Sequence, residues 1–240
     1  MDQSQEPQPQ MVPSEIAQSQ NDQATQQRLS DLTLRTFLDR LASSAPTPGG
    51  GAASAFVGAL GASLISMVCN LTIGRPRYVA VESAMRDILA QSERTREQLI
   101  ALADDDARAY DAVSASYRLP RSTEEERAAR FQAIQQALTR AAGPPLTVME
   151  ACRSLIPLCL QIAAHGNSTV VSDAGVATDL AVAGVRSSII NVRVNLAEIA
   201  DDRFVAASEG RIAAVEAGLA DDYDRAIAIV RAKLAPKARS

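Results

Sequence analysis

Apolar residues recur every three or four positions along most of the chain after residue 31, a spacing that places them on one helix face. Leu34, Phe37, Leu38 and Leu41 form the first such group. Further helices are expected at 52–73, 78–117, 124–142, 146–164, 173–199 and 202–233. No stretch alternates apolar and polar residues for long enough to predict a strand. The pattern predicts an all-α protein with a single multi-helix bundle domain over residues 31–236.

Proline and glycine mark the expected breaks between these helices. The segment 119–122 contains Pro120, and Ser122 or Thr123 is a suitable N-cap ahead of two glutamates. The tripeptide at 143–145, Gly-Pro-Pro, is expected to end the helix before it. Pro157 falls inside the next apolar pattern and is expected to kink that helix.

Residues 1–30 have a different composition, rich in Gln, Pro and Ser with few apolar residues. Such a segment buries too little surface to offset its chain entropy, so it is expected to be a disordered tail. It also lacks the basic start and apolar run of a secretion signal. The three cysteines lie in apolar stretches and are odd in number, which indicates buried thiols in a reducing compartment. A cytoplasmic location is therefore expected.

Charge further limits the partners. The net charge of −4 and the lack of a basic stripe argue against nucleic acid. Between Leu41 and Gly74 no charged residue occurs, a stretch long enough to span a bilayer. Its many small residues instead suit close helix–helix contact, so no membrane partner is expected. A helix that is apolar on all sides is expected to be buried on all sides. Burial that complete often needs a partner subunit, so a homodimer is expected.

Three glycines, Gly49, Gly50 and Gly51, precede the apolar helix. The first turn of a helix has unpaired N–H groups and a partial positive charge, and glycine lets a ligand approach them and permits positive φ. No strand precedes the triplet and no Gly-Lys-Ser/Thr follows it, so neither common nucleotide motif is present. A tight turn between helices explains the same pattern.

An aspartate interrupts an apolar stripe in the helix expected at 78–117. Asp106 shares this stripe, whose members are Leu99, Leu102, Asp106, Tyr110, Val113 and Tyr117. Burying a carboxylate is costly and raises its pKa, which makes Asp106 a candidate acid and base. A cap or an ion pair is the structural alternative. His165 is the only histidine, and no spacing typical of a metal site occurs, so no metal is expected.

Polar residues also occur between the helices expected at 146–164 and 173–199, and within the second of them. Asn167 is placed like a helix C-cap and Asp173 like the next N-cap. Asn191 and Asn195 lie four residues apart among Ile and Val. Buried amides need hydrogen-bond partners, which another helix or a ligand can supply.

Together, "PTPGGG", "NLTIGRPRY", Asp-x-Asp-Ala at 104–107, "GN…SD…VA" and "NV…NL" resemble, in order, the cyclodeaminase/cyclohydrolase family. The resemblance covers the chain from about residue 32 to 233. It implies an all-helical homodimer that acts on tetrahydrofolate derivatives, with no permanently bound cofactor or metal. Asp106 then matches the proposed catalytic residue. The expected folate-binding residues are Gly49, Gly50, Gly51, Arg75, Arg77, Asp104, Asn167, Asp173, Asn191 and Asn195.

The resemblance leaves three activities open. The preferred one is methenyltetrahydrofolate cyclohydrolase, since no formiminotransferase domain is fused to this sequence. The second is formiminotetrahydrofolate cyclodeaminase, which releases ammonia. The third is a non-catalytic folate-binding helical module, and one departure favours it: Ala52 stands where the family usually has serine, unless Ser54 substitutes.

Overall fold

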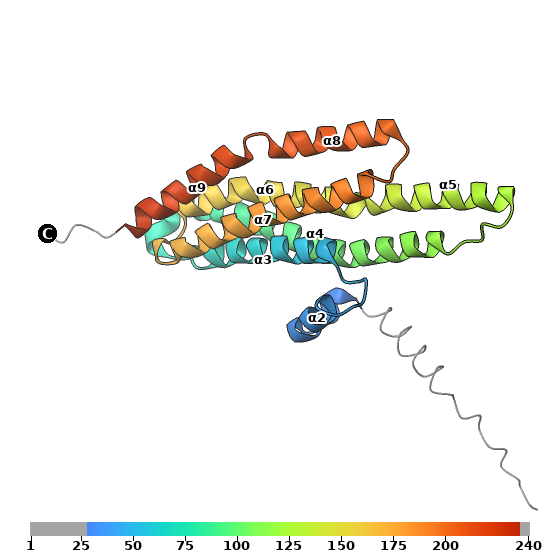
Figure 1. Ribbon diagram of the computed structural model, residues 1–240. Coiled ribbons are helices and arrows are strands. Elements are labelled where there is room, and N and C mark those ends of the chain that lie inside the picture. The colour runs from blue at the N-terminus through green and yellow to red at the C-terminus, as the bar shows by residue number, and fades with distance from the viewer. Residues whose placement is uncertain (1–27, 236–240) are drawn as a thin grey trace, which may run out of the picture.

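The computed structural model describes residues 28–235, and every regular element in that range is a helix (Figure 1). The predicted all-α class is therefore confirmed for these residues. The α-helices are α2 (Leu34–Leu41), α3 (Gly50–Asn70), α4 (Glu82–Tyr117), α5 (Glu124–Ala141), α6 (Gly143–His165), α7 (Val171–Leu196), α8 (Asp202–Glu216) and α9 (Leu219–Leu234). Three short 3-10 helices, η1 (Leu29–Asp31), η2 (Pro76–Val81) and η3 (Ser168–Val170), complete the described chain.

The long helices run alongside one another as a bundle, from which α2 projects (Figure 1). Helix α3 packs against α4, α6 and α7 and forms the centre. Helices α8 and α9 lie along the outer side of α6 and α7, and the α4–α5 hairpin extends beyond the N-terminal end of α3 (Figure 1). This arrangement leaves the start of α3 beside the exposed half of α4, where several of the predicted site residues collect.

Small residues bring three core helices into close contact. A Cβ on Gly58 of α3 would overlap Sγ of Cys152 on α6, and one on Gly184 of α7 would lie 2.6 Å from the same sulfur. All three cysteines are free and buried, as the sequence predicted, and burial raises the pKa of the Cys152 thiol to about 12. The small-residue face of α3 therefore packs inside the bundle of a single chain. The opposite face does not, since Leu60 is 58% exposed.

Two predicted helix boundaries were wrong. The helix before residues 143–145 ends at Ala141, as predicted, but the next one begins at Gly143 and not at 146, because proline is tolerated in the first turn, where its missing N–H has no partner to lose. The single helix expected at 202–233 is broken into α8 and α9 by Gly218, whose φ of +67° suits glycine.

The predicted tail falls largely on residues 1–27, outside the described range. Its last part, which was assigned to the tail, lies against the bundle: Leu29 is buried and its N–H donates a hydrogen bond of 2.6 Å to Asp104. The ordered domain therefore begins at least two residues before the predicted boundary.

By length and composition alone, two helical stretches within residues 28–235 could cross a membrane: α3 and the segment Glu124–His165. In each, 61% of the most apolar window is buried within the protein. The core helices of a globular protein pass the same test of length and composition. The burial of most of each window therefore favours the interpretation of both stretches as core helices.

Candidate functional site

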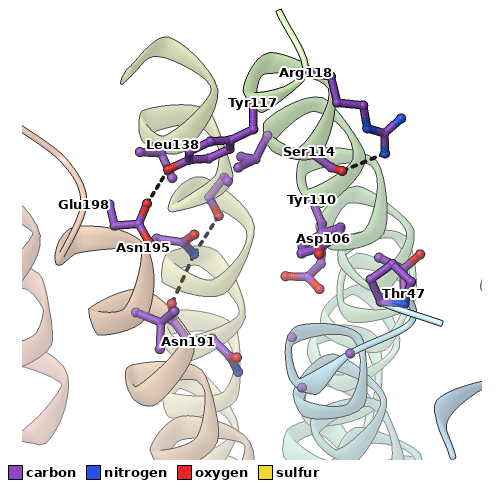
Figure 2. Close-up of a pocket in the computed structure, with 17 residues that line it drawn as sticks. Thr47, Asp106, Tyr110, Ser114, Tyr117, Arg118, Leu138, Asn191, Asn195 and Glu198 are labelled. Atoms are coloured by element: carbon purple, nitrogen blue, oxygen red, sulfur yellow. Dashed lines mark hydrogen bonds between the residues drawn. The ribbon is translucent and has the colours of Figure 1, made fainter. Parts of the chain in front are cut away.

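A cavity of about 640 Å³ opens at the N-terminal end of α3, between α4 and α7 (Figure 2). The glycine triplet forms its floor and Asp106 projects from the α4 wall. Asn191 and Asn195 project from the α7 wall. Six of the eleven residues predicted for the site thus meet in one place. Their binding of folate stays a prediction.

Asp106 lies directly over Gly51, so that a Cβ at Gly51 would overlap the carboxylate. Burial raises the pKa of Asp106, and a hydrogen bond from the Ala52 N–H partly offsets this effect. The N-terminal end of α3, with its unpaired N–H groups, faces the same carboxylate. The result is a partly buried acid that retains access to the cavity and can both accept and return a proton.

Contact with neighbouring side chains explains two of the three glycines. Gly51 is required by Asp106, and a Cβ at Gly50 would lie 3.2 Å from Oδ1 of Asn191. The triplet does not use the positive φ that glycine permits: within residues 28–235 only Gly74 and Gly218 have it.

Ala52, where the family usually has serine, is completely buried and faces the core. Ser54 does not present its hydroxyl to the cavity floor in its place. Its Oγ donates to the carbonyl of Gly50 at 2.7 Å and accepts from Nδ2 of Asn191 at 3.3 Å. Ser54 thereby fixes Asn191 against the start of α3.

The stripe on α4 changes its role at Asp106. Leu99 and Leu102, before it, are buried in the core, whereas Tyr110 and Tyr117, after it, line the cavity and are 44% and 42% exposed. The helical spacing identified this stripe but not its change from core to cavity wall.

Tyr117 and Glu198 close the upper side of the cavity (Figure 2). The Tyr117 hydroxyl donates to a Glu198 carboxylate oxygen, and this carboxylate raises the pKa of Tyr117. Sequence reasoning missed Glu198, although the helix expected at 173–199 would have placed it on the same face as Asn195. In the structure it lies in the turn that follows α7.

Asp104 lies two residues from Asp106 and therefore on the opposite side of α4. Its carboxylate accepts hydrogen bonds from the Leu29 N–H and the Ser30 hydroxyl, at 2.6 and 3.1 Å, and Nε of Arg28 lies 3.7 Å away. These contacts attach the N-terminal segment to the bundle. Asp104 does not line the cavity.

The remaining predicted site residues lie at the other end of α3, about 30 Å away by helix length. Asn167 is buried, and its Nδ2 donates to the carbonyl of Leu71 at 2.9 Å. Arg75 donates to the same carbonyl at 2.7 Å, and Arg77 stacks over Tyr78. Asp173 lies in the first turn of α7. Within one protomer these four residues are not part of the cavity.

The raised pKa of Asp106 makes this residue a source of instability at neutral pH. The folded state holds the proton more tightly than the unfolded state, so ionising the carboxylate at pH 7 favours unfolding. Asp106→Asn should therefore raise the melting temperature at pH 7. The gain should shrink as the pH falls through the raised value toward about 4, where both states become protonated. Calorimetry of both proteins from pH 4 to 8 tests this; a lower melting temperature for the variant at pH 7 would contradict it.

Comparisons with known proteins agree with this architecture. Residues 33–214 match the family model described as formiminotransferase-cyclodeaminase. The methenyltetrahydrofolate cyclohydrolase of Methylorubrum extorquens is 51% identical over 189 residues, which cover 79% of this chain and 89% of that protein. The formimidoyltransferase-cyclodeaminase of Rattus norvegicus is 36% identical over 81% of this chain, which spans only 36% of that longer protein.

A solved structure also superposes closely. The formiminotetrahydrofolate cyclodeaminase of Thermotoga maritima has a TM-score of 0.76 and 32% sequence identity, covering 85% of this chain and 98% of that one. Since the family model matches most of the chain and the 51% identical relative is covered almost end to end, the chain belongs to the formiminotransferase-cyclodeaminase family, as its motifs predicted.

Proposed function

We propose that this protein is a methenyltetrahydrofolate cyclohydrolase, which converts 5,10-methenyltetrahydrofolate and water to 10-formyltetrahydrofolate. Support comes from the 51% identical relative of that name and from the family membership. The observation that carries the proposal is Asp106: a carboxylate of raised pKa, held over a glycine at the floor of an open cavity.

The chemistry requires one group that moves a proton twice. The amidinium carbon between N5 and N10 is electrophilic, and Asp106 takes a proton from the water that attacks it. The resulting tetrahedral carbinol then collapses. The bond from carbon to N5 breaks, Asp106 returns its proton to N5, and the hydroxyl proton leaves to solvent. One water is consumed and one proton is released. No permanently bound cofactor or metal forms part of this proposal.

Formiminotetrahydrofolate cyclodeamination is the second candidate, favoured by the likeness to the Thermotoga maritima structure of that name. In that reaction N10 of the folate attacks the formimino carbon attached to N5, and ammonia leaves from that carbon, so Asp106 could again shuttle the proton. Giving both substrates to the purified protein and recording the methenyl absorbance and ammonia separates the two. Loss of methenyl absorbance without ammonia supports hydrolysis, and ammonia release from the formimino substrate supports deamination.

A non-catalytic folate-binding module is the third possibility. Its one favourable feature, Ala52, is weakened because that side chain faces the core and not the cavity. Tight binding of both substrates without turnover of either would support the module and contradict the proposed reaction.

We further propose that the protein is a homodimer, joined through the outer faces of α3 and α7. These helices pack side by side and carry exposed apolar side chains: Leu60, Met67, Val176, Ile190 and Val194. Leu60 and Met67 are seven residues apart on α3, and on α7 Ile190 lies fourteen residues after Val176 and four before Val194, so each set forms one stripe on its helix. Val194 also lines the cavity, so a partner on this face would lie beside the site. The same patch would serve both subunits of a two-fold dimer.

A charge on this surface should separate the subunits. Leu60→Glu would place an unpaired carboxylate in the interface, a costly burial that should weaken the dimer at least tenfold. Sedimentation equilibrium measures the effect. Phe131→Glu on α5, where the phenylalanine is similarly exposed at 57%, is the matched control and should leave assembly unchanged. An unchanged dimer from Leu60→Glu would place the interface elsewhere.

We also propose a cytoplasmic location for this enzyme. Its proposed substrate is a small folate, so the reaction needs neither a nucleic-acid nor a membrane partner. The net charge of −4 and the burial of the apolar helices within the bundle support this view. Purification as a dimer without detergent is the corresponding test.

A further inference from the structure

The cavity wall at the end of α7 has three polar side chains whose free polar atoms are all hydrogen-bond acceptors. Asn191 and Asn195, four residues apart, project from one face of the end of α7, and Glu198 lies three residues further on, in the turn after the helix ends at Leu196. The row extends about 10 Å along the helix direction. We call these three residues the acceptor row.

Hydrogen bonds fix the orientation of both amides in this row. Nδ2 of Asn191 donates to the carbonyl of Ser187 at 3.0 Å, and Nδ2 of Asn195 donates to the carbonyls of Asn191 and Ala141, at 3.1 and 3.3 Å. A backbone carbonyl only accepts, so the nitrogen must face it and Oδ1 must point the other way. No donor from residues 28–235 reaches either Oδ1 within hydrogen-bond distance.

Glu198 ends the row with a carboxylate that is held on one side only. One of its oxygens accepts from the Tyr117 hydroxyl, which leaves the other available to the cavity (Figure 2). Gln135 fixes the backbone around it: its Nε2 donates to the carbonyl of Glu198 at 2.9 Å, and its Oε1 accepts from the Ala200 N–H at 2.7 Å. The carboxylate is therefore positioned before any ligand arrives.

A wall of acceptors suits a ligand edge rich in donors. A reduced pterin ring has an N3–H and a 2-amino group side by side, a pair of donors that matches a carboxylate, and it has a further ring N–H. Its other end carries the cationic amidinium. The acceptor row offers the carboxylate at one end and places Asn191 beside Gly50, near Asp106, at the other.

Building on the proposed function, we infer that the acceptor row recognises the pterin ring. Glu198 accepts from the N3–H and 2-amino pair, and Asn195 accepts from a ring N–H. Asn191 lies beside the amidinium, which keeps the reacting carbon next to Asp106. The aminobenzoyl-glutamate tail then leaves on the opposite side of the cavity, past Thr47 and Arg118 (Figure 2). The glycine loop thus holds the centre of the substrate and neither of its ends.

Binding measurements test this inference without relying on turnover. The probes are 5-formyltetrahydrofolate and its 2-desamino-2-methyl analogue, titrated calorimetrically into the full-length wild type and Glu198→Gln. Glutamine keeps the size of the side chain but replaces one acceptor oxygen with a donor and removes the charge. The variant should bind the amino-bearing ligand at least tenfold more weakly and should lose clearly less affinity for the analogue, which keeps only the N3–H of the donor pair. Glu150→Gln, which alters an exposed carboxylate paired with Arg211 on the far side of the bundle, should change neither affinity.

Each other outcome has a definite meaning. Equal losses for both ligands, or no loss for either, would overturn the assignment of Glu198 to the pterin while leaving the cyclohydrolase proposal intact. Failure of the wild type to bind 5-formyltetrahydrofolate would overturn this inference, whereas the proposed function is overturned separately, by failure to turn over 5,10-methenyltetrahydrofolate in the absorbance assay. Melting temperatures of both variants, recorded beside the titrations, show whether a loss comes from unfolding.

Discussion

Asp106→Asn should lower kcat for methenyltetrahydrofolate hydrolysis by about 10²–10⁴-fold, the usual contribution of a general acid and base. Asparagine has nearly the same shape and can keep an oxygen toward the Ala52 N–H, but it cannot accept a proton from water. KM should change little, because the contacts that hold the pterin lie on α7. The measurement is the decay of the methenyl absorbance at saturating substrate.

The pH profile gives an independent sign of the same group. Asp106 must be ionised to act as a base, so wild-type kcat should fall as the pH drops through its raised pKa. Asp105→Asn is the matched control, since Asp105 is its chain neighbour, 47% exposed and paired with Arg108. That variant should keep the wild-type rate. If Asp106→Asn retains full turnover, the proton is moved by another group.

The all-helical class and the position of Asp106 could be predicted because both depend on local spacing. Leu99, Leu102, Asp106, Tyr110 and Tyr117 share one helix face whatever surrounds the helix. What covers that face is a tertiary property: the core covers its first half and the cavity borders its second. The sequence therefore located the acid but not the two tyrosines as cavity wall.

The distribution of the family motifs shows the same limit. Neighbours in sequence diverge on a helix, so Asp104 and Asp106 have different partners although one motif contains both. The two ends of α3 are separated by the length of the helix, so Arg75 and Asn167 lie far from the glycine triplet. The order of the motifs identified the family. Only the fold shows which of the motif residues line the cavity and which lie elsewhere.

Gly51→Ala should lower kcat by about 10²-fold, although alanine favours the helix more than glycine does. The added Cβ would overlap the Asp106 carboxylate, so the carboxylate or the start of α3 must shift. A displacement of about 1 Å at a catalytic group can cost this much in rate. Overpacking costs about 1–3 kcal/mol, partly offset by the helix propensity of alanine, about 1 kcal/mol above that of glycine. Stability should therefore change much less than activity.

The control for this substitution is another glycine inside a helix. Gly210 of α8 has open space where a Cβ would be, so Gly210→Ala should stabilise the protein slightly and leave the rate unchanged. Rates from the methenyl absorbance and melting temperatures for both variants distinguish a displaced carboxylate from a general effect of alanine. A Gly51→Ala enzyme with wild-type kcat would mean that the close approach of Asp106 to α3 is not needed for catalysis.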